Sequence, residues 1–294
     1  MALNFSERLI DPRSPDRRPR RAAYALPTLF TAGNIFLGFV AILQSYQGAM
    51  QAASNSLVSN PHLLLAAKLI GWAVFLDGLD GRIARMTNTV SDFGREMDSL
   101  ADVITFGIAP AVLAFAWGVQ FMEPPTIVAP DLIMRVGYLM AFLFLLCGAA
   151  RLARFNVQTN PVPKNPGRPD RKYFVGLPIP AGAGMVAAVA YACDCIPLQW
   201  WISSILWLAL LGLLSFLMVS TWRYPSFKGI DLARPRSPLW IILAGAFIYL
   251  IWNFSQPVLL AMASAYVGSG IAIRAGGVLR RRLRHSPHPE HQVG

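Results

Sequence analysis

The sequence predicts an all-α integral membrane protein with about eight transmembrane helices. Its 294 residues are 55% hydrophobic and only 14% charged, whereas a soluble domain usually carries about 25% charged residues. Several apolar runs approach the roughly 20 residues that a helix needs to cross a bilayer. All but two of the 26 Lys and Arg residues lie in alternate gaps between those runs or in the two tails.

The apolar runs divide into eight predicted spans. Residues 239–273 are too long for one span, and Asn253, Ser255 and Pro257 break them into two. The spans are predicted at about 27–47, 62–82, 98–121, 132–154, 174–195, 199–221, 239–253 and 257–273. We therefore expect one transmembrane domain at 26–273, a disordered basic tail at 1–25 and a basic tail with histidines at 274–294.

The distribution of basic residues predicts how the chain is oriented. The gaps at 48–61 and 122–131 contain no Lys or Arg, whereas the gaps on the other side and both tails are rich in them. Lys and Arg collect on the cytoplasmic side of membrane proteins. We expect a multi-pass protein of the cell membrane with both termini cytoplasmic. The net charge of +11 then reflects topology, and no nucleic acid partner is expected.

A group of acidic residues lies where the second and third predicted spans meet. Asp77 and Asp80 are three residues apart, and Asp98 and Asp102 are four apart, so each pair shares one face of a helix. Carboxylates at the edge of a span are costly and indicate a functional site. Converging carboxylates suit hard divalent cations such as Mg²⁺ or Mn²⁺, and two such ions would hold a phosphoryl group.

Small residues and an arginine are interleaved with these acids. Gly78, Gly81 and Ala84 remove bulk beside Arg85, and Gly94 does the same at the entry to the third span. Arg85 offers a planar fork of donors that fits phosphate oxygens. The stretch is therefore consistent with a metal-bound diphosphate beside a guanidinium group. The alternative, a charged interfacial loop that only sets topology, accounts poorly for four acids at helical spacing.

The pattern D-x2-D-G-x2-A-R-x8-G-x3-D-x3-D, from Asp77 to Asp102, resembles the signature of the CDP-alcohol phosphatidyltransferases at every fixed position. Other runs resemble the phosphatidylserine synthase branch of that family. They are L-F-T-A-G-N-I-F-L-G-F at 29–39, A-D-V-I-T-F-G-I-A-P-A at 101–111, R-L-A-R-F-N at 151–156 and F-V-G-L-P-I-P-A at 174–181. The resemblance covers about residues 26–220, with weaker support to residue 273.

This resemblance implies a roughly six-helix core, followed here by two C-terminal helices, around a polar cavity that faces the cytoplasm in a homodimer. It implies two divalent cations bound by Asp77, Asp80, Asp98 and Asp102. It implies that Asp102 is also the base. It implies contacts to the CDP group from Gly81, Ala84, Arg85 and Gly94. The implied reaction transfers a phosphatidyl group from the membrane lipid CDP-diacylglycerol to L-serine, giving phosphatidylserine and CMP.

Serine carries a carboxylate, so its pocket should contain a fixed cation. Arg151 and Arg154 are the candidates, because they lie three residues apart at the cytoplasmic end of the fourth predicted span and would share a helix face. Arginine can hold a carboxylate with two hydrogen bonds. The two arginines could instead only anchor the helix among lipid headgroups. The carboxylate would then be bound elsewhere, for example by Lys164, Arg168, Arg171 or Lys172.

Three other functions are compatible with the sequence. The first is transfer to another alcohol, such as glycerol phosphate, inositol phosphate or choline, by a member of the same family. The second is a cation transporter with an acidic site within the membrane. The third is a structural membrane protein, which should bind no divalent metal at the acidic stretch.

Overall fold

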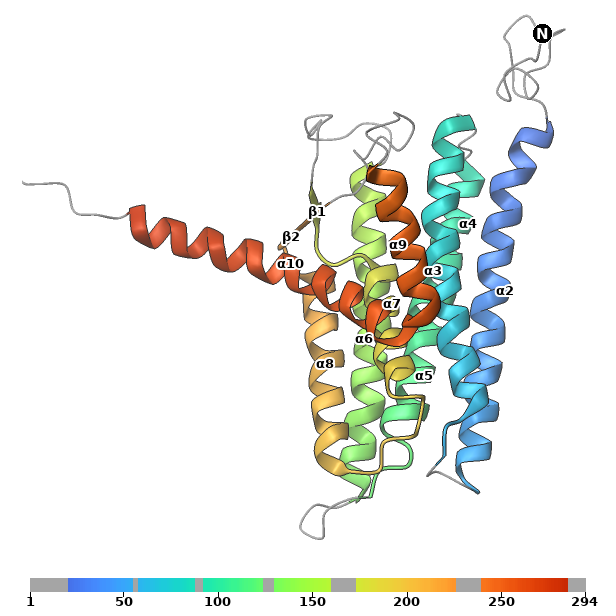
Figure 1. The fold of residues 1–294 in the computed structure, drawn as a ribbon, viewed down its shortest axis with the longest axis vertical. Helices are drawn as coiled ribbons and strands as arrows, with labels where there is room; N and C mark the ends of the chain where they lie inside the picture. The colour runs from blue at the N-terminus through green and yellow to red at the C-terminus, as the bar shows by residue number, and fades with distance from the viewer. Residues whose placement is uncertain are drawn as a thin grey trace, which may run out of the picture.

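The computed structural model describes residues 21–54, 58–87, 92–123, 130–159, 173–225 and 239–284. Within these ranges, six helices are long and apolar enough to cross a membrane. Most of the helices run side by side in an elongated bundle (Figure 1). The prediction of an all-α integral membrane protein is confirmed.

Each predicted span coincides with helical structure. In chain order the helices are α2 (Arg21–Ala52), α3 (Pro61–Thr87), α4 (Asp92–Asp102), the π-helical η1 (Val103–Ile108), α5 (Ala109–Gly118), α6 (Pro130–Thr159), α7 (Ile179–Ala192), α8 (Trp201–Val219), α9 (Leu239–Asn253) and α10 (Ser255–Arg284). The third predicted span thus comprises three consecutive elements, α4, η1 and α5.

Three of the helices differ from the simple picture of eight parallel spans. Helices α7 and α9 contain 14 and 15 residues, fewer than the roughly 20 that cross a bilayer. Helix α10 runs across the bundle instead of along it (Figure 1), and it continues to Arg284, beyond the predicted boundary at residue 273. Helix α7 is short because Tyr173–Val175 form a strand and Pro178 precedes the first helical turn.

That strand belongs to a small sheet that the sequence did not predict. Strand β1 (Tyr173–Val175) pairs antiparallel with β2 (Arg223–Pro225), with Val175 opposite Arg223. Gly176 follows β1 with φ of +80°, a conformation that favours glycine. A Cβ atom there would lie 2.5 Å from the carbonyl oxygen of Met218. The sheet therefore joins the start of α7 to the end of α8.

At the opposite end of the bundle, α2 and α3 form a tight antiparallel pair. Asn60 caps α3, because its Oδ1 accepts hydrogen bonds from the backbone N–H groups of His62 and Leu63 at 3.1 and 3.2 Å. The Asn60 amide also donates to the carbonyl oxygen of Gly48 in α2 at 2.8 Å. One side chain thus starts α3 and fixes it against α2.

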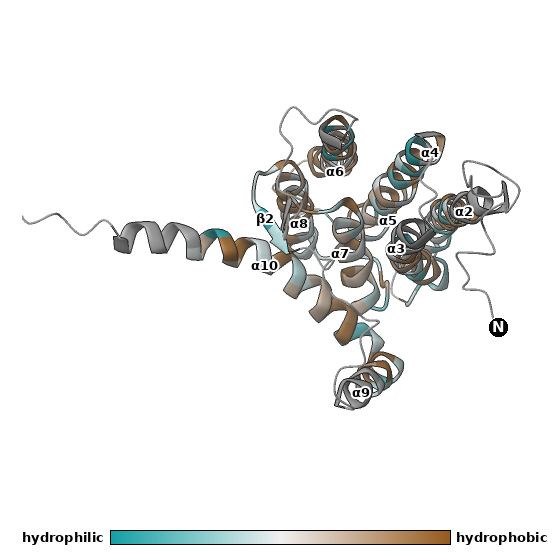
Figure 2. Cartoon of the chain, turned by 90° about the horizontal axis from the view of Figure 1, so that it is seen from above, coloured by the Kyte–Doolittle hydropathy of each residue, from teal (hydrophilic) through white to brown (hydrophobic). Residues whose placement is uncertain are grey.

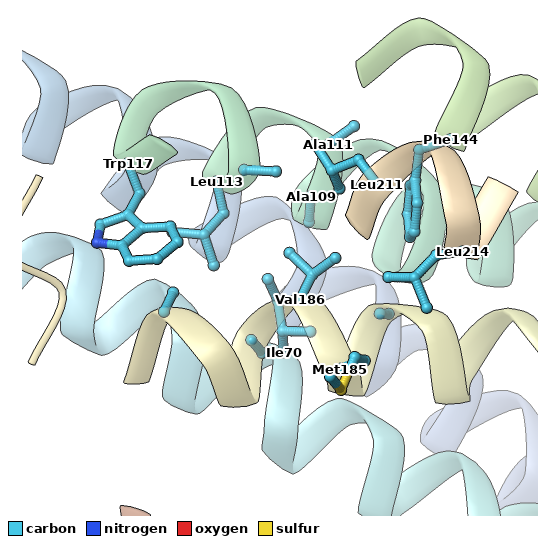
Figure 3. Close-up of a cluster of buried hydrophobic side chains, with 14 of the residues drawn as sticks. Ile70, Ala109, Ala111, Leu113, Trp117, Phe144, Met185, Val186, Leu211 and Leu214 are labelled. Carbon is cyan, nitrogen blue, oxygen red and sulfur yellow. The ribbon is translucent and has the colours of Figure 1, made fainter. Parts of the chain in front are cut away.

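Helix α7 lies at the centre of the bundle, among α3, α5 and α8, when the molecule is seen from above (Figure 2). Its Met185 and Val186 pack in the buried apolar cluster with Ile70 of α3 and Leu214 of α8 (Figure 3). Helix α10 lies against α7. Its first residue, Ser255, shares a hydrogen bond of 2.7 Å with the hydroxyl of Tyr191.

We predict that Gly176→Ala destabilises the protein. The left-handed backbone conformation costs an alanine about 1–2 kcal/mol, and the new Cβ would also collide with a backbone carbonyl. Thermal unfolding in detergent, followed by tryptophan fluorescence, should show a lower midpoint. The matched control is Gly71→Ala in α3, where a Cβ would meet nothing within 4 Å. If both variants unfolded at the wild-type temperature, the close approach at Gly176 would be refuted.

Candidate active site

Three of the predicted carboxylates converge between two helices. Asp77 comes from α3, and Asp98 and Asp102 come from α4; one carboxylate oxygen of each lies within 4.8 Å of the others. Asp102 is buried, and the other two are half-buried. The two helices therefore pack so that these three carboxylates converge. The side chain of Asp80, one turn after Asp77, lies outside the described residues.

The position of Asp102 follows from the local structure of α4. Asp98 and Asp102 are one helical turn apart, and Ala101 and Asp102 are buried while Arg95, Glu96 and Leu100 are exposed. The α-helix ends at Asp102, and the next six residues form the π-helix η1. Such wider turns occur often at functional sites. The change of helix type thus comes directly below the carboxylate cluster.

Helix α2 packs closely against this wider turn. The hydroxyl of Thr105 donates to the carbonyl oxygen of Asn34 at 2.9 Å. Gly38 allows the approach, because a Cβ there would lie 2.6 Å from Oγ1 of Thr105. Asn34 is buried, and its Oδ1 has no hydrogen-bond partner among the described residues. The sequence contained a signal for Asn34, a polar side chain inside an apolar span, although its role was not predicted.

Arg151 of α6 lies beside the carboxylate cluster. It is buried, and its charge interacts with that of Asp102. A hydrogen bond of 2.7 Å from the amide of Asn156 to the hydroxyl of Ser99 fixes α6 against α4. The Nε–H of Arg151 has no hydrogen-bond partner among the described residues. Arg151 therefore has a buried donor that a bound ligand could use.

Arg154, the second predicted arginine, has different surroundings. Its guanidinium group donates to the carbonyl oxygen of Val219 at 3.1 Å and to that of Val175 at 3.5 Å. These bonds join α6 to the end of α8 and to strand β1. The two arginines share a helix face but not a partner. Arg154 donates to carbonyl groups beside the small sheet, whereas Arg151 interacts electrostatically with Asp102.

The remaining predicted site residues are described only in part. Gly94 is half-buried in α4, one turn before Asp98. The last turns of α3 carry Gly81, Ala84 and Arg85, whose side-chain positions lie outside the described residues. The alternative cations Lys164, Arg168, Arg171 and Lys172 also lie outside them.

Comparison with known proteins decides which family this arrangement belongs to. Residues 24–215 match the family model of the CDP-alcohol phosphatidyltransferases. The chain belongs to this family. The match includes the three carboxylates and Arg151, whereas β2, α9 and α10 lie beyond it.

Several relatives within the family bear names that specify a reaction. A CDP-diacylglycerol–serine O-phosphatidyltransferase of Helicobacter pylori strain 26695 is 38% identical over 213 residues, 72% of this chain and 76% of that protein. The enzyme of that name from Bacillus subtilis is 32% identical over 203 residues, 69% of this chain and 91% of that protein. An archaetidylserine synthase of Methanothermobacter thermautotrophicus is 33% identical over 208 residues, 70% and 72% of the two chains.

The donor set of this CDP-alcohol phosphatidyltransferase site fits a divalent cation. Three carboxylates supply only oxygen ligands, which Mg²⁺ and Mn²⁺ prefer. The Oδ1 atom of buried Asp102 has no hydrogen-bond partner among the described residues. Without a counter-charge, three carboxylates at this distance would repel one another in surroundings of low polarity. The cluster could therefore bind metal through Asp77, Asp98 and Asp102.

We predict that Asp98→Asn weakens metal binding by at least about tenfold, because it removes one of three converging charges; even loss of an outer-shell partner typically costs 10–100-fold. Mn²⁺ titration of the purified protein, followed by the rise in unfolding temperature, measures the effect. The control is Glu96→Gln, an exposed acid of the same helix. Equal Mn²⁺ affinity in both variants would exclude Asp98 as a ligand.

Proposed function

We propose that this protein transfers a phosphatidyl group from CDP-diacylglycerol to the hydroxyl group of L-serine, giving phosphatidylserine and CMP. The observation that carries the proposal is the convergence of Asp77, Asp98 and Asp102 beside Arg151, within a membrane protein of the CDP-alcohol phosphatidyltransferase family. The names of the relatives specify serine as the acceptor, and archaetidylserine synthase has the same headgroup in its name.

The proposed reaction exchanges one bond to phosphorus for another. The serine hydroxyl oxygen forms a bond to the phosphorus atom that carries the diacylglycerol. The bond from that phosphorus to the bridging oxygen of the diphosphate breaks, and CMP leaves with its electron pair. The hydroxyl proton passes to the carboxylate of Asp102, which is buried and has an oxygen without a hydrogen-bond partner among the described residues.

We propose that this chemistry takes place at the carboxylate cluster. We propose that Asp77, Asp80, Asp98 and Asp102 hold two divalent cations, Mg²⁺ or Mn²⁺, whose positive charge would neutralise the diphosphate. Gly81, Ala84, Arg85 and Gly94 would contact the CDP group, since these residues lie within the signature that the chain shares with its family. Positioning and electrostatic stabilisation would supply most of the rate acceleration.

Arg151 would bind the serine carboxylate in this arrangement. Its charge interacts with that of Asp102, and a hydrogen bond from Asn156 to Ser99 joins α6 to α4. A carboxylate on Arg151 would therefore bring the serine hydroxyl toward the proposed base. Arg154 would then act as a positioning residue, because its guanidinium is bonded to two backbone carbonyls.

We propose that the active site faces the cytoplasm in the cell membrane and that the protein is a homodimer. The orientation is supported by the basic residues Arg95, Arg151, Arg154 and Arg223, which lie on the elements around the carboxylate cluster. The dimer is supported only by the family resemblance.

The proposed orientation predicts which engineered cysteines react in intact cells. In a cysteine-free background, Ser54→Cys, in the exposed turn that follows α2, should react with a membrane-impermeant thiol reagent. Glu96→Cys, exposed on α4 near the carboxylate cluster, should react only after the membrane is permeabilised. The opposite labelling pattern would place the cluster outside the cytoplasm.

The acceptor itself is tested by a screen of alcohols. Purified protein with CDP-diacylglycerol and Mn²⁺ should release CMP rapidly with L-serine and at least about tenfold more slowly with glycerol phosphate, inositol phosphate or choline. Asp98→Asn is the inactive control. Equal or faster release with another alcohol would reassign the acceptor within the family. Cation flux through proteoliposomes without any CMP release would favour a transporter instead.

A further inference from the structure

Three buried polar groups, one each on α4, α6 and β2, share an unusual property. The Oδ1 of Asp102, the Nε of Arg151 and the hydroxyl of Tyr224 all lack a hydrogen-bond partner among the described residues. Asp102 and Arg151 are each 9% exposed, and Tyr224 is 0% exposed. Leaving such a group buried and unsatisfied destabilises the folded state, and native proteins rarely keep one without a reason.

The three groups are connected through Tyr266 of α10. Its phenol interacts electrostatically with Arg151 and with Tyr224, and the rings of Tyr224 and Tyr266 lie 5.8 Å apart. The hydroxyl of Tyr266 also lies 3.5 Å from the carbonyl oxygen of Pro225 in β2. Arg151 in turn interacts with Asp102. These electrostatic interactions link the proposed base to Tyr266 through Arg151, and Tyr266 lies beside the small sheet.

Helix α10 packs closely over Tyr224 and the small sheet. It packs against β2 and α7, and Gly270 lies directly on the ring of Tyr224. A Cβ at Gly270 would be 2.2 Å from that ring, so a larger residue could not take its place without moving α10 or Tyr224. The burial of Tyr224 is thus produced by α10, which lies outside the residues that match the family model.

The unsatisfied groups are complementary to an amino acid. The Nε–H of Arg151 and the hydroxyl of Tyr224 are donors, which suit the two oxygens of a carboxylate. The Oδ1 of Asp102 is an acceptor, which suits a hydroxyl or an ammonium group. A small molecule that carries a carboxylate together with hydroxyl and ammonium groups satisfies both kinds. Choline has no carboxylate, so it would leave the two donors unpaired.

We infer that Arg151 and Tyr224 form the carboxylate-binding part of the acceptor pocket, and that α10 closes this pocket over them. The inference rests on the proposed function and deepens it, because it adds β2 and α10 to Arg151 of α6 as determinants of acceptor specificity. Tyr224 donates a hydrogen bond to the acceptor carboxylate. Gly270 and Tyr266 hold α10 in the position that shields this bond from water.

The decisive variant is Tyr224→Phe, which keeps the ring and removes only the hydroxyl. A hydrogen bond to a charged group contributes about 1.5–3 kcal/mol, so the KM for serine should rise about tenfold or more while that for CDP-diacylglycerol stays unchanged. The control is Tyr191→Phe, which removes a hydroxyl bonded to Ser255 at the start of α10 and should leave both values unchanged. If both KM values rise together, or neither does, the inference is wrong.

Closure by α10 is tested by a second pair of variants. Gly270→Ala places a methyl group against the ring of Tyr224 and should also raise the KM for serine selectively. The control is Gly268→Ala, because a Cβ at Gly268 would meet nothing within 4 Å. Its KM for serine should equal that of the wild type. A Gly270→Ala enzyme with unchanged serine KM would show that α10 does not close the pocket.

Acceptor analogues test the same contact with the unaltered protein, so the test survives if a variant does not fold. Serinol and L-serine methyl ester lack a free carboxylate and should be at least about tenfold poorer acceptors than serine. With either analogue, wild type and Tyr224→Phe should be equally slow. Wild-type protein that used serinol as well as serine would overturn the inference without affecting the transfer reaction. Wild-type protein that used no serine at all would overturn the proposed function itself.

Discussion

The electrostatic cost of grouping carboxylates at the edge of an apolar bundle is the constraint on which the rest of the structure depends. The oxygens of Asp77, Asp98 and Asp102 lie within 4.8 Å of one another, where like charges repel strongly in surroundings of low polarity. The fold tolerates this arrangement because Arg151 lies close by and because the donor set suits a divalent cation. Removing either source of positive charge would leave buried negative charge without compensation.

Holding charges in this arrangement requires the helices to stay fixed. Gly38 lets α2 approach Thr105 just below Asp102, and the contact between Asn156 and Ser99 sets the height of α6 against α4. Asn60 ties α2 to α3 at the other end of the bundle. None of these residues is a proposed ligand, yet each limits how far the carboxylates can separate.

Much of this site could be predicted from the sequence, because it depends on the spacing of residues that are close together in the chain. The spacing of Asp98 and Asp102 defines a shared helix face, and long apolar runs define spans. The remaining features depend on contacts between distant segments. The β1–β2 sheet joins residues about 50 positions apart, and the π-helix after Asp102 has no compositional signal. Arg154 shares a helix face with Arg151, but its guanidinium group donates to the backbone carbonyls of Val175 and Val219, which no sequence spacing could predict.

The residues proposed for the chemistry at phosphorus and those proposed to select the acceptor alcohol lie partly in different segments of the chain. The residues proposed to bind the diphosphate and the cations, and Asp102 as the proposed base, all fall within 24–215, the part that matches the family model. Tyr224 and the helix that buries it fall outside that part. Members of one family can share the chemistry at phosphorus while they differ in the alcohol they accept. A chain that completes its acceptor pocket with segments after the shared core can alter the choice of alcohol through those segments while the carboxylates that act at phosphorus stay unchanged.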